Sequence, residues 1–195
     1  LLIQPVNMIS VLASGPITRV SVDSNGAQAN GSSRRSQISG DGRFVVFESD
    51  ATNLAGGGGG LFLKDRQTGA ITRISADGGH ATISYDGRFV AFDSANELVS
   101  ADTNDLFDVF LYDRQSGATT RVSMDSTGAQ VNGNSITPSI SDNGRFVAFQ
   151  SDATNLVIGD ENGATDIFVH DNQTGITERI SLTSDGAGAN ASSFG

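Results

Sequence analysis

The sequence predicts an all-β protein assembled from repeated four-stranded antiparallel units, and three observations lead to this prediction. The chain has 195 residues, of which 37% are hydrophobic, and this is enough for a packed core. It contains 24 glycines and 3 prolines, a balance typical of many tight turns between short strands. One motif also occurs three times along the chain, at a spacing typical of repeat architectures.

The recurring motif is a tight turn followed by an apolar strand. It reads Asp-Gly-Arg-Phe-Val-Val-Phe at 41–47, Asp-Gly-Arg-Phe-Val-Ala-Phe at 86–92 and Asn-Gly-Arg-Phe-Val-Ala-Phe at 143–149. A second motif follows each copy, with the sequences DRQTG at 65–69, DRQSG at 113–117 and DNQTG at 171–175. Because both motifs recur in the same order, each copy is expected to form the same structural unit.

Four strands are expected in each unit, and in the third copy they fall at 136–141, 145–151, 166–171 and 176–182. The Asp/Asn-Gly and Thr/Ser-Gly pairs predict tight turns after the first and third strands, so the unit should be a meander. The second strand is continuously apolar and should be covered on both faces, whereas the fourth alternates and should present Arg179 and Ser181 to water. This pattern is typical of a propeller blade.

The third copy resembles the WD40-like PD40 repeats of TolB-type β-propellers, through ISDNGRFVAF at 140–149 and DIFVHD at 166–171. The resemblance covers about residues 17–182. Gly40, Tyr85 and Asp142 occupy the position where the family usually has proline. The resemblance implies a propeller that acts as a protein-binding platform or as an accessory domain of a hydrolase.

The repeats divide the chain into three blades, at 23–75, 76–124 and 125–182. Residues 1–22 are interpreted as the end of a preceding blade, with a degraded strand at 6–11, and 183–195 as the lead-in to a next blade. Closed propellers contain about four to eight blades. We therefore expect either a fragment of a larger propeller or one half of a six-bladed homodimer.

Composition narrows the range of partners and compartments. The formal charge of −10, without a run of Lys or Arg, argues against nucleic acid as a partner. The chain lacks cysteine, so disulfides and thiolate chemistry are absent. Residues 1–16 are the most apolar stretch, but polar residues interrupt them, and we expect neither a signal peptide nor a membrane span there. The acidic composition, rich in Ser, Thr, Asn and Gly, favours a periplasmic or extracellular setting.

Two acidic loops are candidates for calcium (Ca²⁺) binding, because both have the pattern D-x-N-x-x-x-D just before a strand. Oxygen ligands at the first, third and seventh positions of a tight loop suit a hard cation. The alternative is that Asp and Asn cap the turns through backbone amides. The first repeat has glycines 56–60 in place of this loop. The candidate metal ligands are Asp102, Asn104, Asp108, Asp160, Asn162 and Asp166.

Recurring arginines are interpreted as structural, since residues that occur once per blade usually serve the blade by pairing with recurring carboxylates. The alternative is a ring of arginines that recognises a carboxylate-bearing partner. Of the two histidines, His170 occupies the position of Lys64 and Tyr112, and we expect it to be exposed. Neither His80 nor His170 lies in a metal-like or catalytic pattern.

These observations predict a non-catalytic propeller module that binds a protein or another ligand. Internal repetition without a unique polar cluster favours binding over catalysis. Two alternatives stay open: an accessory or substrate-gating propeller of a hydrolase that acts on peptides or glycans, and a self-assembling structural propeller.

Overall fold

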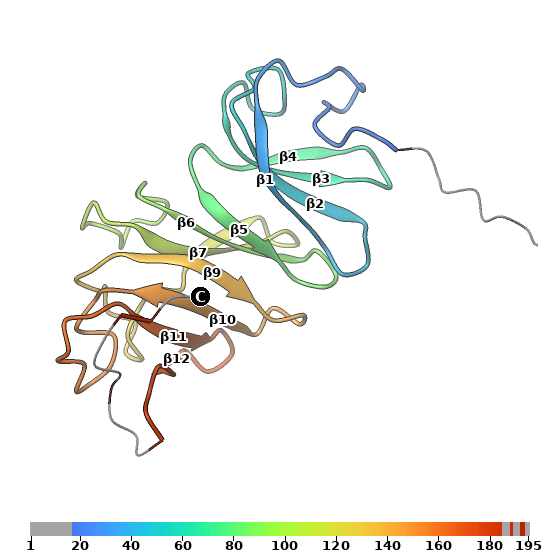
Figure 1. The fold of residues 1–195 in the computed structure, drawn as a ribbon. Coiled ribbons are helices and arrows are strands. Elements are labelled where there is room, and N and C mark those ends of the chain that lie inside the picture. Colours follow the sequence, from blue (N-terminus) through green and yellow to red (C-terminus); the bar gives the residue numbers. More distant parts are fainter. Residues whose placement is uncertain (1–16, 185–187, 189–191, 194–195) are drawn as a thin grey trace, which may run out of the picture.

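The computed structural model describes residues 17–184, 188, 192 and 193, and in this part the chain forms strands and turns without a helix (Figure 1). The twelve strands form three four-stranded sheets. Blade 1 contains β1 Ser33–Ile38, β2 Phe44–Ser49, β3 Gly60–Asp65 and β4 Ile71–Ser75. Blade 2 contains β5 Gly79–Ile83, β6 Phe89–Ser94, β7 Asp108–Asp113 and β8 Ala118–Arg121. Blade 3 contains β9 Ser135–Ile140, β10 Phe146–Ser151, β11 Asp166–Asp171 and β12 Ile176–Arg179.

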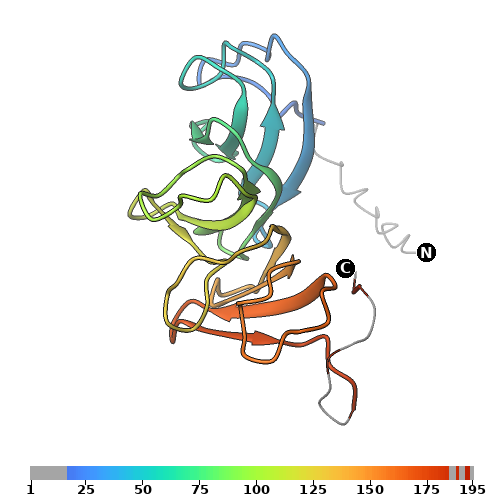
Figure 2. The same cartoon turned by 90° about the vertical axis from the view of Figure 1, so that its left-hand side faces the viewer.

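Each sheet is an antiparallel meander in which neighbouring strands are consecutive in the chain. The three sheets follow one another in an arc, as Figure 2 shows from the side. The all-β prediction and the four-stranded blades are confirmed. The three sheets lie within the ranges 23–75, 76–124 and 125–182.

The Asp/Asn-Gly turns between first and second strands form as the sequence predicts. Gly87 and Gly144 have φ of 66° and 71°, a conformation that side chains with a Cβ rarely adopt. Both glycines also lie beneath an aromatic ring of the preceding blade, Phe44 and Phe89 respectively. The turn therefore needs glycine for its backbone and for the approach of the neighbouring blade.

Phenylalanine pairs hold the second and third strands of each blade together. The ring centroids of Phe47 and Phe62 lie 5.9 Å apart in blade 1, and the pairs in the other blades are 5.9 and 6.0 Å apart. Blades then pack face to face. One buried cluster joins blades 1 and 2 around Phe44 and Phe92, and another joins blades 2 and 3 around Leu111 and Phe149. In blade 2 this packing covers the apolar second strand on both faces, because that blade lies between two neighbours. In blade 1 the second face is covered by Val20, Ala29 and Ile71 instead.

The ends of the repeat differ in part from the prediction. The fourth strand of blade 3 ends at Arg179 rather than Leu182. In the described part of the blade end expected at 1–22, the only strand pairing is an isolated bridge between Val22 and Gln28. Equivalent bridges join Met124 to Gln130 and Leu182 to Gly188. The predictions for residues 1–16, including the strand at 6–11, lie outside the described residues, as does most of the lead-in at 183–195.

Within the described part of the chain, no helix has both the length and the hydrophobicity that crossing a bilayer requires.

Candidate functional site

The first strand of every blade carries a β-bulge with a non-glycine residue in the left-handed region. These residues are Arg35, His80 and Thr137, with φ of 48°, 42° and 51°. Each lies four residues before the serine that precedes the Asp/Asn-Gly turn. Bulges redirect a side chain without changing the rest of a sheet. The backbone device is therefore shared by the three blades, whereas the side chain that it presents differs between them.

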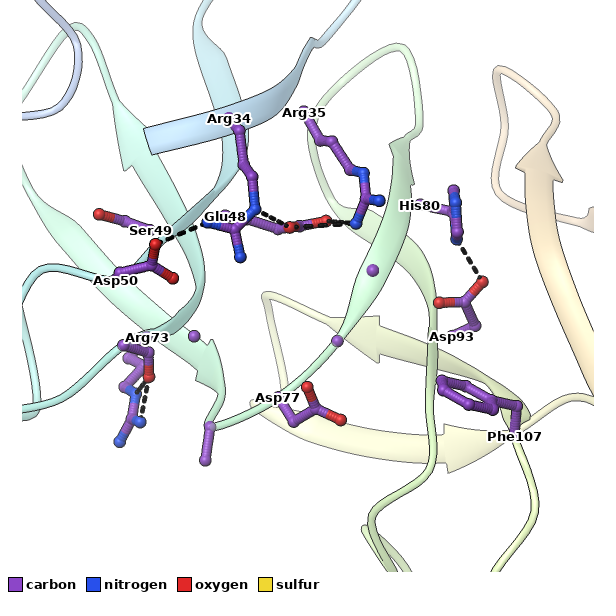
Figure 3. Close-up of a pocket in the computed structure, with 15 residues that line it drawn as sticks. Arg34, Arg35, Glu48, Ser49, Asp50, Arg73, Asp77, His80, Asp93 and Phe107 are labelled. Carbon is purple, nitrogen blue, oxygen red and sulfur yellow. Dashed lines mark hydrogen bonds and ion pairs between the residues drawn. The ribbon is translucent and has the colours of Figure 1, made fainter. Parts of the chain in front are cut away.

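A cavity of about 650 Å³ lies at the seam between blades 1 and 2, next to two of these bulges. Figure 3 shows the side chains of Arg34, Arg35 and His80 along one side of it, with Arg73 and Asp77 opposite. Four glycines also line the cavity, so part of its wall is main chain: Gly59, Gly60, Gly78 and Gly79. This volume is within the range of small-ligand and peptide-side-chain sites.

Glu48 organises the arginines on the blade 1 side of the cavity. Its carboxylate is buried and lies 3.1 Å from Arg34 Nε and 3.1 Å from Arg35 Nη1. Arg34 also contacts Asp50, with 2.7 Å between Nη1 and Oδ2. Both arginine side chains remain about half exposed, so they are fixed in place and still accessible from the cavity.

His80 is held by Asp93, the residue of β6 that corresponds to Glu48 of β2. The His80 Nδ1 lies 2.9 Å from Asp93 Oδ2, and the Asp93 side chain is 3% exposed. Because a carboxylate only accepts at this contact, Nδ1 carries the proton and Nε2 is the ring atom that remains for a ligand. The Thr137 amide donates to the same Asp93 Oδ2 at 2.9 Å, which ties blade 3 to this site.

The recurring motifs do not point to this site, because the residues that form it differ between the blades. Aligning the three first strands on Ser39, Ser84 and Ser141 places Arg35, His80 and Thr137 in one column. The partner column contains Glu48, Asp93 and Gln150. In the sequence, the signal for this site was that polar residues of different types occupy two equivalent positions of the repeat.

The first acidic loop brings Asp102 and Asp108 together around an arginine of the same blade. Arg121 Nη1 lies 3.5 Å from Asp102 Oδ1 and 3.5 Å from Asp108 Oδ2, and all three side chains are nearly inaccessible. Ser123 donates to the other oxygen of Asp108. Burial raises the pKa of Asp108 to about 6.

Asn104, the third predicted ligand of this loop, faces its own turn. Its Oδ1 accepts from the Leu106 amide at 3.1 Å, and its Nδ2 donates to the Val131 carbonyl at 3.0 Å. The amide therefore links the loop to the segment that leads into blade 3, as the turn-capping alternative expected.

The second acidic loop repeats this arrangement. Arg179 Nη1 lies 2.7 Å from Asp160 Oδ1 and 3.5 Å from Asp166 Oδ2. Ser181 donates to Asp166 Oδ1 at 2.5 Å, and Asn162 Nδ2 donates to Asp166 Oδ2 at 2.9 Å. Burial raises the pKa of Asp160 as well.

An arginine lies against both carboxylates of each loop, where the sequence predicts calcium. Calcium needs oxygen ligands at 2.3–2.6 Å, and a guanidinium nitrogen lies within 3.5 Å of both members of each pair. In the described ranges, no three or more His, Cys, Asp or Glu side chains gather in a way that could hold a metal ion. In each loop the arginine thus places a positive charge beside the two carboxylates.

The arginines of the Asp/Asn-Gly-Arg motif pair as predicted with the recurring aspartates of the third strands, whereas Arg73 donates to the Gly59 carbonyl. Arg43 contacts Asp65, and Arg145 contacts Asp171, each with 2.7 Å between Nη2 and Oδ2. The hydrogen bond from the arginine lowers the pKa of each carboxyl well below its usual range. In blade 2, Arg88 contacts Asp113 at 3.0 Å and lowers the pKa of Asp113 to about 2.

Two exposure predictions were wrong. Arg179 was expected to face water, yet it is turned inward by the buried aspartates. His170 is also buried, and its Nδ1 lies 2.9 Å from Thr177 Oγ1. Burial lowers the pKa of His170. Arg179 meets aspartates of the preceding loop and strand, and His170 meets Thr177 of the following strand. The local sequence does not reveal either partner.

No family model matches the chain, and no curated protein matches it with significance. Solved structures match it as β-propellers. A putative TolB from Agrobacterium tumefaciens aligns with a TM-score of 0.50 at 19% identity, over 75% of this chain and 45% of that one. The tricorn protease aligns with a TM-score of 0.50 at 18% identity, over 73% and 14% of the two chains.

An oligogalacturonate lyase from Vibrio parahaemolyticus aligns with a TM-score of 0.50 at 14% identity, over 82% of this chain and 45% of that one. The chain thus spans less than half of the length of each of these proteins. The three blades have the β-propeller fold.

Proposed function

We propose that this chain is a non-catalytic β-propeller module that binds a protein partner at the cavity between blades 1 and 2. The observation that carries the proposal is the pair of strained bulge residues, Arg35 and His80, each fixed by a buried carboxylate and each presented to one cavity. Non-glycine residues in strained backbone tend to cluster at functional sites.

The lining of the cavity favours a peptide segment as the ligand. Its glycine walls expose main chain, to which a peptide backbone can hydrogen bond. Its side chains offer both cationic and anionic groups, with Arg73 and Asp77 facing Arg34 and Arg35. A peptide carries both kinds of partner within a few residues.

A display library of random dodecapeptides tests this proposal directly. Peptides selected on the wild-type chain are expected to lose binding to Arg35→Ala and to His80→Ala, and to keep it on Arg19→Ala, which removes an exposed arginine outside the cavity. Selected peptides that bind all four proteins equally would place the binding surface elsewhere and refute the assignment.

An accessory propeller of a hydrolase is the second candidate. The tricorn protease has the same fold, and the imidazole of His80 oriented by Asp93 is an arrangement that proton-transfer sites also use. A hydrolase domain elsewhere in the full-length protein, whose activity on peptide or glycan substrates changes with His80→Ala, would favour this candidate over a stand-alone binding module.

Calcium binding stays a prediction. It requires Arg121 and Arg179 to withdraw from the carboxylates that they now contact. Thermal unfolding in millimolar calcium and in chelator decides the question: a raised midpoint in calcium, lost in Asp102→Asn, supports the ion, and identical midpoints exclude it.

A periplasmic or extracellular location is also proposed, supported by the acidic, cysteine-free composition. The homodimer predicted from the number of blades is supported by two blade faces that no other blade of the described chain covers.

A further inference from the structure

The two interfaces between blades share one construction. An aromatic ring at the start of the second strand lies over the turn glycine of the next blade. A Cβ added to Gly87 would collide with Phe44, and one added to Gly144 would collide with Phe89. Phe44 is accordingly only 3% exposed.

The chain has one further aromatic ring and one further turn glycine of this kind, and no other blade of the described chain packs against either. Phe146 occupies the position of Phe44 and Phe89 on blade 3, and it is 40% exposed. Gly42 occupies the position of Gly87 and Gly144 on blade 1, and a Cβ there would meet no atom nearer than Arg66 Nη1 at 4.0 Å. In the described structure, therefore, no other blade covers the aromatic ring at one end or the glycine turn at the other.

An arginine of blade 2 completes the interface between blades 1 and 2. Arg114 enters a groove beside Phe44, with its guanidinium carbon 4.2 Å from the ring centroid. Arg114 is positioned by a hydrogen bond to the Gly87 carbonyl at 2.9 Å. On blade 1 the equivalent residue is Arg66, which is exposed and donates in the same way to the Gly42 carbonyl at 2.5 Å.

Blade 3 has the groove that would accept Arg66. It has a volume of about 170 Å³ and is lined by Phe146, Val169, Ile176 and Glu178 among others. Glu178 is exposed and pairs with Val169 in the register in which Thr72 pairs with Leu63 in blade 1. The uncovered groove therefore carries a carboxylate where the internal groove has a threonine, and this charge complements Arg66.

We propose that the free face of blade 3 binds blade 1 of a second copy of this chain, with Phe146 over Gly42 and Arg66 beside Glu178. Two identical contacts of this kind, related by a twofold axis, close six blades into a ring. The proposal specifies the surface of the proposed homodimer, and it is independent of the peptide site between blades 1 and 2.

Blade 1 has room for this contact. A hollow of about 200 Å³ lies beside Val45 and Phe47 on the free face of blade 1. On blade 3 the equivalent residues, Val147 and Phe149, belong to the cluster that contains Ala91 of blade 2. Val20 and Ala29 already pack on this side of blade 1, as Val122 and Val131 do on blade 3. Ile180 occupies the corresponding position after the fourth strand of blade 3 and is 53% exposed. Because Val20 of blade 1 already fills this place in the proposed contact, Ile180 of the second copy stays outside it.

Disulfide trapping tests the contact, because the natural chain has no cysteine. Arg66→Cys and Glu178→Cys proteins, mixed and oxidised, are expected to form the mixed dimer at least about tenfold faster than Arg66→Cys with Glu97→Cys, an exposed glutamate on blade 2. Equal rates for the two mixtures would overturn the proposed surface.

Light scattering on the wild-type chain gives the second readout. A mass of two chains is expected for the wild type and for Ile158→Asp, which changes a fully exposed loop residue, and a mass of one chain for Phe146→Asp. Circular dichroism checks that both variants fold. A monomeric wild type overturns the homodimer, and a dimer that Phe146→Asp leaves intact overturns this surface; neither result bears on peptide binding.

Discussion

Gly144 lies in the contact between blades 2 and 3, where a Cβ atom has no room, whereas Gly175 lies in an open turn. Both glycines lie in tight turns of blade 3, with φ of 71° and 74°. A Cβ at Gly144 would collide with the ring of Phe89 in blade 2, whereas a Cβ at Gly175 would meet nothing within 4 Å. Gly144→Ala and Gly175→Ala therefore impose the same backbone strain and differ in the contact between blades.

The expected losses follow from these two contributions. An alanine in the left-handed region costs about 1–2 kcal/mol of unfolding free energy. Forcing a methyl group against a packed ring costs about 1–3 kcal/mol more. Gly175→Ala should thus lose about 1–2 kcal/mol, and Gly144→Ala about 2–5 kcal/mol.

Urea denaturation followed by far-ultraviolet circular dichroism measures both losses, with the wild type as reference. The difference between the two variants isolates the contact with Phe89, since the backbone contribution cancels. Equal losses would refute the reasoning, because they would mean that blades 2 and 3 do not pack through this turn.

Three further predictions concern charged groups. Arg121→Met leaves two buried carboxylates without a cation and should lower the free energy of unfolding, measured in urea, by about 3–5 kcal/mol. Arg73→Met loses only hydrogen bonds to a carbonyl and should lower it by about 1 kcal/mol; similar losses would contradict the role of Arg121. The pKa of Asp108 is raised to about 6, so its contribution to stability is full below about pH 4 and falls as the pH rises through 6. Asp108→Asn should remove this decline in thermal unfolding measured across the range, and an unchanged dependence of the unfolding midpoint on pH would contradict the prediction. The pKa of Asp113 is lowered to about 2, so the stability it gains from Arg88 is present above about pH 4 and is lost as the pH falls through 2; acid titration of Arg88→Gln should show a smaller loss, and an identical acid transition would argue against the pair.

The acidic loops show how far local sequence could predict a site. The spacing of Asp102 and Asp108 correctly indicated that the carboxylates converge. It could not reveal the contact with Arg121, because this residue lies on another strand and reaches the loop only when the sheet forms. A carboxylate pair read from sequence is equally compatible with a metal ion and with a guanidinium.

Exposure was predicted less well than strand position. His170 and Arg179 lie in strands whose bounds were close to those expected, yet His170 is buried and the Arg179 side chain is only 10% exposed. Alternation along a strand indicates which face a side chain is on, and the neighbouring loop or connector then decides whether that face is covered.

The sequence by itself determined the repeat, the four strands of each blade and the glycine turns that join them, because periodicity and turn chemistry are local properties. The tertiary structure decided which charged groups meet, since Glu48 and Asp93 select Arg35 and His80 across neighbouring strands. The tertiary structure also decided that Phe146 is 40% exposed although the motif around it matches that of buried Phe44, because burial depends on whether another blade packs against the ring.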